Sequence, residues 1–133
     1  MTLVVDASVA AKWVLNEEGT ERAIALRSED GLITPSILVA EIGSAIWKAA
    51  RRDLIAPADA IAAIRDVLLP FEALVPDDEL RVPALAMAIE IGHPIYDCFY
   101  LALAERERCA LITADARLIE AAKGIRNVEV RAL

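Results

Sequence analysis

The stretch Val4-Val5-Asp6-Ala7-Ser8 decides the fold of this chain, because an apolar run ends there at a carboxylate. Leu3 to Val5 is short, continuous and rich in β-branched residues, which is typical of a strand buried on both faces. Residues 7–15 look like a short helix that begins immediately after Asp6. A buried strand that turns at once into a helix is the first half of an α/β unit.

The rest of the chain continues this alternation. The pair Thr34-Pro35 is a signal for the start of one helix. A later helix is predicted to be capped by Asp77 or Asp78 and to end at Gly92. Strands separated by helices predict a parallel sheet covered by helices on both faces, in one domain over residues 1–133. Further strands are predicted at 31–34, 71–75 (extended or a short strand), 110–113 and 128–130, and helices at 20–27 (capped by Thr20), 34–52, 57–70, 78–92, 96–108 and 115–123.

Composition indicates an ordinary globular domain. Hydrophobic residues make up 57% of the 133 residues, yet no apolar run approaches the ~20 residues that a membrane helix needs. The N-terminus shows no pattern of a signal peptide. We therefore expect a cytoplasmic protein without membrane attachment, in which Cys98 and Cys109 are reduced, buried thiols.

The net charge of −7 argues, taken alone, against a nucleic-acid partner, since phosphate binding usually shows as a basic surface. The net charge excludes less if several of the acids are metal ligands. One basic cluster, Lys48, Arg51 and Arg52, either faces phosphate or complements the dipole at a helix C-terminus.

Four acids stand where the predicted fold brings them together. Asp6 and Asp115 follow strands, so both lie at the carboxyl edge of the sheet, where ligands bind in such folds. Glu41 and Asp97 interrupt the apolar stripes of two predicted helices. Each acid also has a structural alternative. Asp6, Asp97 and Asp115 could each cap a helix, and Glu41 could lie at the edge of its stripe or pair with Lys48.

The chemistry of four converging carboxylates favours a hard divalent cation. Buried acids are costly unless something neutralises them. Mg²⁺ or Mn²⁺ prefers oxygen ligands, and such an ion with acids is a site for phosphodiester hydrolysis. No cysteine or histidine pair is spaced for zinc, and His93, the only histidine, is interpreted as a loop residue before Pro94.

At this point the chain resembles a PIN-domain nuclease, and more narrowly a VapC-type toxin. The resemblance covers the whole chain, and it rests on the order and spacing of four segments: residues 4–8, the helix from Thr34-Pro35 to Glu41, residues 96–104, and Leu111 to Asp115. It implies a three-layer sandwich around a five-stranded parallel sheet, and a Mg²⁺- or Mn²⁺-dependent endoribonuclease. It also implies a homodimer and inhibition by a small VapB-type antitoxin.

The resemblance also implies roles for individual residues. Asp6, Glu41, Asp97 and Asp115 match the acidic quartet, with Asp6 and Asp97 as the chief metal ligands. The hydroxyl positions beside the site match Ser8 and Thr113, while Ala7 stands where the family often has a second small polar residue.

Three competing interpretations remain at this stage. A haloacid-dehalogenase-like phosphatase needs a second aspartate two residues after the first, and this chain has Ser8 there. A phosphoacceptor signalling domain needs paired acids after its first strand and a lysine near its last, and neither is present. A PIN-like domain without nuclease activity, acting as a binding module, agrees with the same residues.

Overall fold

Five short parallel strands form one sheet, whose order places the acid-bearing ends of β1 and β4 side by side. In the computed structural model, which describes residues 1–133, the order is β3-β2-β1-β4-β5. All neighbouring pairs are parallel, which confirms the predicted sheet. The strands are β1 (Leu3–Val5), β2 (Leu32–Pro35), β3 (Ala73–Val75), β4 (Ala110–Thr113) and β5 (Val130–Ala132).

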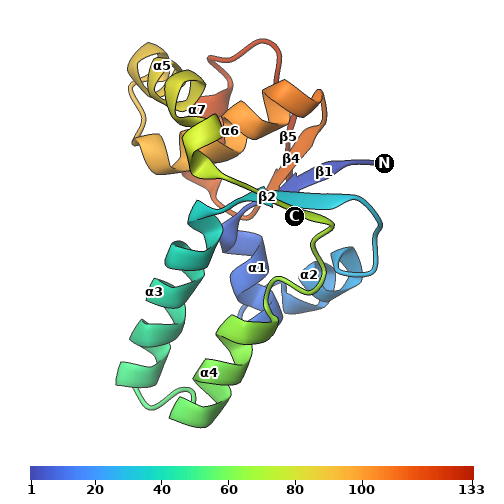
Figure 1. The fold of residues 1–133 in the computed structure, drawn as a ribbon. Coiled ribbons are helices and arrows are strands. Elements are labelled where there is room, and N and C mark those ends of the chain that lie inside the picture. The colour runs from blue at the N-terminus through green and yellow to red at the C-terminus, as the bar shows by residue number, and fades with distance from the viewer.

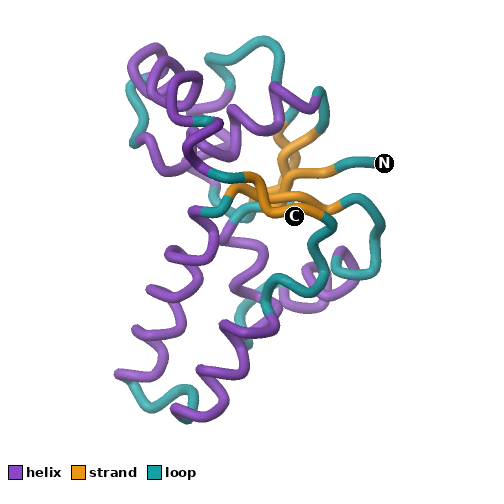
Figure 2. The backbone as a smooth tube through the Cα atoms, viewed as in Figure 1, coloured by secondary structure: helices purple, strands orange, loops and turns teal.

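Helices cover both faces of the sheet, as the alternation of segments predicts. Figure 1 shows α5, α6 and α7 on one side and α1 and α2 on the other, with α3 and α4 paired as an extension. Figure 2 shows the helices that connect the strands, and at least one helix lies between every two successive strands. The helices are α1 (Ala7–Val14), α2 (Thr20–Leu26), α3 (Ile37–Arg51), α4 (Pro57–Asp66), α5 (Arg81–Ile91), α6 (Ile95–Glu107) and α7 (Ala116–Ala122), with a 3₁₀ turn η1 at Asp77–Glu79.

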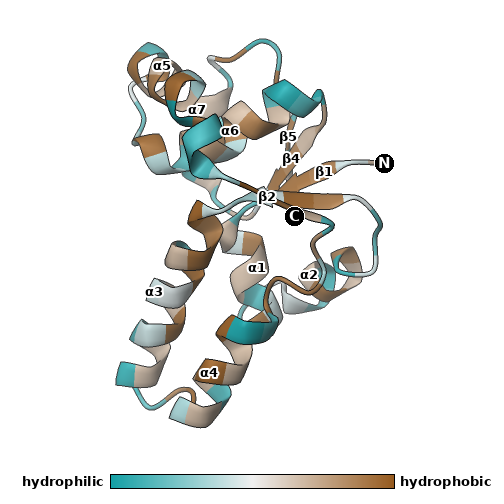
Figure 3. Cartoon of the chain, viewed as in Figure 1, coloured by the Kyte–Doolittle hydropathy of each residue, from teal (hydrophilic) through white to brown (hydrophobic).

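The alternating side chains of β1 divide the core between the two faces. Val4 packs into the larger cluster, which contains the buried residues of α6. Leu3 and Val5 point the other way and pack with Val9 and Ala23 of α1 and α2. The central strands β1 and β4 are correspondingly coloured as hydrophobic in Figure 3. Because both faces are covered, only the ends of the strands are left for polar groups.

The strand order reverses beside β1, and this reversal locates the candidate site. The chain adds β2 and β3 on one side of β1, then crosses over to add β4 and β5 on the other. A crevice at the carboxyl ends of the strands is expected at such a point. Asp6 follows β1 and Asp115 lies two residues after the last residue of β4.

The prediction that Thr34-Pro35 opens a helix is wrong. Both residues belong to β2, where Pro35 is in register with Val75. Helix α3 begins at Ile37, and its first free N–H donates to Asp77 Oδ1 at 3.0 Å. Asp77 or Asp78 was expected to cap the helix that ends at Gly92, but that helix, α5, begins at Arg81 with Leu80 as its N-cap. Asp77 caps α3 from forty residues away instead, because β2 and β3 are neighbours.

Other element boundaries differ from the prediction. Gly19, not Thr20, is the N-cap of α2. Regular helix α4 ends at Asp66 rather than continuing to Pro70. The last strand is β5 at Val130–Ala132 rather than 128–130, because Thr113 pairs with Ala132.

Two further expectations concern the membrane and the cysteines. The longest helix, α3, has 15 residues, and none of the helices has the length and apolar content that crossing a bilayer requires. Both cysteines are free; Cys98 is buried, whereas Cys109 is half-buried rather than fully buried.

Candidate active site

Asp6 is the most deeply buried acid and lies at the switch between β1 and α1. Its side chain is only 3% exposed, and Oδ1 accepts hydrogen bonds from Ser8 Oγ at 2.6 Å and from the N–H of Val9 at 3.2 Å. Thr113 Oγ1 donates to Oδ2. The sequence alternative, a helix cap, is therefore correct for Asp6, and its second oxygen remains turned toward β4.

Burial raises the pKa of Asp6 from 3.8 to about 6. The hydrogen bonds from Ser8, Thr113 and the Val9 N–H oppose this rise, because they stabilise the carboxylate. The negative charge of Asp97 adds to the rise. Asp97, far away in sequence, is thus close enough to Asp6 for the two charges to repel.

The hydroxyl groups of Ser8 and Thr113 connect the β1–α1 junction to the β4–α7 junction. Each donates to Asp6, and each also accepts: Ser8 from the N–H of Ala114 at 2.9 Å, and Thr113 from the N–H of Asp115 at 3.0 Å. The two hydroxyl oxygens are 3.3 Å apart. They hold Asp6 at the boundary between β1 and β4.

Glu41 reaches the same region from α3. Its Oε1 accepts a hydrogen bond from Tyr100 Oη at 2.6 Å. Burial raises the pKa of Glu41, the Tyr100 hydrogen bond lowers it, and the charges of Asp97 and Asp6 raise it again. Glu41 forms no ion pair with Lys48 or any other cation, so that sequence alternative is wrong.

Asp97 lies in the first turn of α6 and is 25% exposed. It does not cap the helix; Oδ2 lies 2.6 Å from His93 Nε2. His93 is therefore more than a loop residue, and its spacing of four from Asp97 was the signal that sequence reasoning missed. Tyr100 was missed as well, and no local signal could link it to Glu41, because their contact spans 59 positions.

Asp115 is the N-cap of α7, as its structural alternative proposed. Its Oδ1 accepts from the N–H of Arg117 at 2.9 Å, and the side chain is 31% exposed. The backbone N–H of Asp115 donates to Thr113 Oγ1, whereas its carboxylate caps α7. As placed, no three acid, histidine or cysteine side chains are close enough to form a complete metal-ligand group.

The donor set nevertheless fits a hard divalent cation. Asp6, Glu41 and Asp97 have no Lys or Arg partner, and no hydrogen bond reaches Glu41 Oε2 or Asp97 Oδ1. Since no buried side-chain oxygen lacks a partner, these two unbonded oxygens face solvent. Open carboxylate oxygens beside a buried third acid are the ligands that Mg²⁺ and Mn²⁺ prefer.

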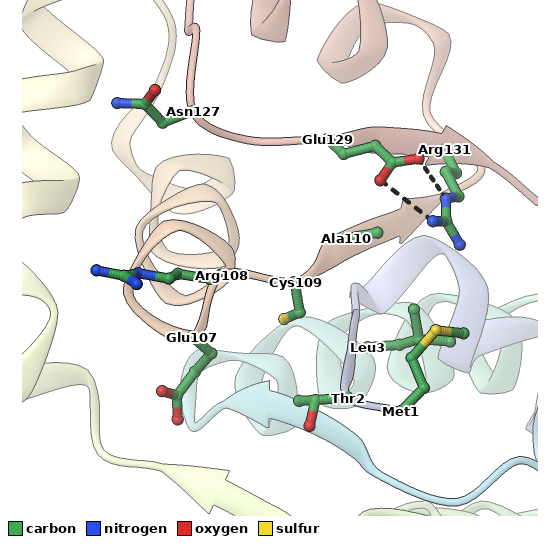
Figure 4. A pocket seen from close by; sticks show the side chains of 10 residues that line it. All are labelled: Met1, Thr2, Leu3, Glu107, Arg108, Cys109, Ala110, Asn127, Glu129 and Arg131. Carbon is green, nitrogen blue, oxygen red and sulfur yellow. Dashed lines mark hydrogen bonds and ion pairs between the residues drawn. The ribbon is translucent and has the colours of Figure 1, made fainter.

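The basic cluster predicted from the sequence lies elsewhere. Lys48 and Arg51 occupy the last turn of α3, with Arg51 stacked 4.8 Å over the ring of Trp47. A hollow of about 470 Å³ also lies away from the acids, at the opposite edge of the sheet. Figure 4 shows its lining, including Cys109 and the paired Glu129 and Arg131, and no member of the quartet.

Residues 3–124 match the model of the PIN domain. The chain belongs to the PIN-domain family. This PIN domain is also similar in sequence to Ribonuclease VapC3 of Pyrobaculum aerophilum, with 35% identity over 90% of this chain and 94% of that protein. It is 34% identical to Ribonuclease VapC9 of Mycobacterium tuberculosis, over 87% of each chain.

The fold of this PIN domain also matches a solved structure. The DNA-bound VapBC of Salmonella typhimurium superposes with a TM-score of 0.72, over 99% of this chain and 98% of that one. Its sequence identity is 16%, so this likeness concerns the fold alone.

Proposed function

We propose that this PIN domain is a Mg²⁺- or Mn²⁺-dependent endoribonuclease and the toxin of a toxin–antitoxin pair, working in the cytoplasm. The observation that carries the proposal is the buried Asp6 beside Glu41 and Asp97, with no Lys or Arg to neutralise the three. The VapC ribonucleases that the chain resembles support the same activity.

Asp6, Glu41 and Asp97 would hold the ion, with Asp115 as a fourth carboxylate at the same edge. An ion bound there would supply an acidified water and would stabilise negative charge on the phosphate. In the reaction a water oxygen joins phosphorus, one ester P–O bond breaks, and the leaving oxygen takes up a proton. The chain's part is positioning: Ser8 and Thr113 orient Asp6, Tyr100 orients Glu41, and His93 orients Asp97.

The test is cleavage of a circular single-stranded RNA by the purified protein. A circle has no ends, so its opening requires an endonuclease, whereas an exonuclease would degrade only the linear form. We expect opening with Mg²⁺ or Mn²⁺, none in excess EDTA, and almost none for Asp97→Asn. Cleavage that survives EDTA would contradict the metal mechanism, and intact RNA under all conditions would favour the binding module.

We also propose a homodimer. The exposed side of α5 carries Val82, Leu85 and Ile89, which are 73%, 52% and 75% exposed and lie on one helical face. A second copy is the occupant that the resemblance implies for an apolar surface of this kind. Light scattering should give a dimer for the wild type and a monomer for Leu85→Asp, with Leu54→Asp as the exposed control on another surface.

A VapB-type antitoxin is the proposed inhibitor. Three carboxylates without a cation can accept a guanidinium from a partner, in place of the metal. Cleavage should stop when the antitoxin encoded beside the gene is added in excess. Unchanged cleavage in its presence would contradict this part of the proposal.

A further inference from the structure

A groove of about 320 Å³ adjoins the hydroxyl side of the candidate site. It is lined by residues of α1, of α2 and the loop before it, of α7, and of the carboxyl ends of β4 and β5. Thr113 and Ala114 belong to its lining, and these are the residues that contact Asp6 and Ser8. The groove thus begins where the acid cluster ends.

Two cations line this groove, Lys12 and Arg22, and neither forms an ion pair. Glu18 carries the one side-chain carboxylate in the lining. Five other cations of the chain have an acid partner, and the remaining seven, like Lys12 and Arg22, have none. Lys12 and Arg22 are distinguished by their location, because in a chain with a net charge of −7 they place two unpaired positive charges beside the acid cluster.

The position of Lys12 on α1 and the packing of its side chain direct this side chain toward the groove. It follows Ser8 by four residues, so both lie on one face of the helix, about 6 Å apart along the axis. The stem of Lys12 is half-buried against Gly19: a Cβ there would lie 3.7 Å from its Cδ and Cε. Since a lysine with a packed stem keeps its charged end in water, we expect the ammonium group at the polar rim of the groove.

We propose that this groove binds a backbone phosphate of single-stranded RNA next to the one that is cleaved, with Lys12 and Arg22 as its ligands. The inference rests on the proposed nuclease function. An acidic protein repels RNA, and the carboxylates of the site add to that repulsion, so productive binding needs cations beside the site. An acidic segment of a protein partner is the other candidate occupant, and the experiment separates the two.

The experiment measures RNA binding without cleavage. In an Asp97→Asn background, the affinity for a fluorescently labelled single-stranded oligonucleotide is measured over a range of salt concentrations. Lys12→Gln and Arg22→Gln should each weaken binding about fivefold at 0.1 M salt and reduce the slope of log K against log salt by about 0.7. Arg126→Gln is the matched control, because Arg126 is exposed and precedes β5 at the opposite edge of the sheet.

Cleavage kinetics provide the second readout. With the acids intact, Lys12→Gln should raise KM about fivefold and leave kcat within about twofold of wild type, since uniform binding is lost. Unchanged affinity and slope in folded variants would overturn the proposal. An Asp97→Asn protein that binds no RNA would also overturn it. The same holds if the substitutions at Lys12 and Arg22 weaken only the complex with the antitoxin. A wild type that does not cleave, yet binds RNA through Lys12, would instead refute the nuclease function and leave the groove standing.

Discussion

Tyr100 on α6 and Glu41 on α3 are joined by a hydrogen bond of 2.6 Å, in which the tyrosine hydroxyl donates to the carboxylate. The Tyr100 side chain is 1% exposed, and burial together with the charge of Glu41 raises its pKa well above 10. The hydroxyl therefore stays protonated and remains a donor. This bond connects the buried core to a proposed metal ligand.

Tyr100→Phe tests that connection. The ring is retained, but Glu41 loses the hydrogen bond that lowers its pKa, so the acidic limb of the pH–activity profile should move to higher pH. We expect kcat to fall about tenfold and stability to fall by about 1–3 kcal/mol. Tyr96→Phe is the control, because Tyr96 is 60% exposed and donates no hydrogen bond. Loss of stability with an unmoved pH profile would make Tyr100 a packing residue only.

Asp6 predicts how the stability of the metal-free protein depends on pH. Its pKa is about 6 in the folded state and near 3.8 in the unfolded chain. Between these two pKa values Asp6 is protonated in the folded state but ionised in the unfolded chain. The free energy of unfolding therefore falls as pH rises, and the stabilisation that comes from the bound proton is lost above pH 6. Asp6→Asn keeps the helix cap. Its free energy of unfolding, relative to that of wild type, should increase by up to about 3 kcal/mol as the pH rises from 4 to 7.5.

The measurement is denaturant unfolding of both proteins in EDTA at several pH values. Asp30→Asn serves as the control, since Asp30 is an exposed loop residue. A constant difference between Asp6→Asn and wild type across this range would show that Asp6 does not titrate with a raised pKa.

Asp97→Asn should separate metal binding from folding. The substitution removes the charge that raises the pKa of both Asp6 and Glu41, while the amide can still bond to His93. Melting in EDTA should therefore occur at least as high as for wild type, whereas the gain from Mn²⁺ and the cleavage of RNA should nearly vanish. If the variant cleaves and is stabilised by Mn²⁺ like wild type, the carboxylates are structural.

Asp115 has a cap role that the structure shows and a proposed catalytic one, and two substitutions distinguish them. Asp115→Asn preserves the bond to the Arg117 N–H, so its melting temperature should match wild type. Asp115→Ala should lose about 1 kcal/mol of stability. If the carboxylate serves the metal, both should lose at least about tenfold in activity; full activity in Asp115→Asn would restrict Asp115 to capping.

Much of the architecture followed from local pattern. The apolar runs at Leu3–Val5 and Ala110–Thr113 predicted buried strands, and the alternation with helices predicted the parallel sheet. Asp6 and Asp115 could be located at one edge because each lies within two residues of the end of a strand. These inferences held because strand burial and helix spacing depend on neighbours in sequence.

The tertiary structure alone decided the contacts that complete the site. Asp77 caps α3, Tyr100 binds Glu41, and Thr113 binds Asp6 because strand order brings distant segments together. The same order extended β2 to Pro35, against the preference of Thr34-Pro35 for a helix start. Sequence pattern determined which residues are acids at strand ends and on helix faces. Which partner each acid has depends on packing across the sheet, a long-range property that local spacing does not encode.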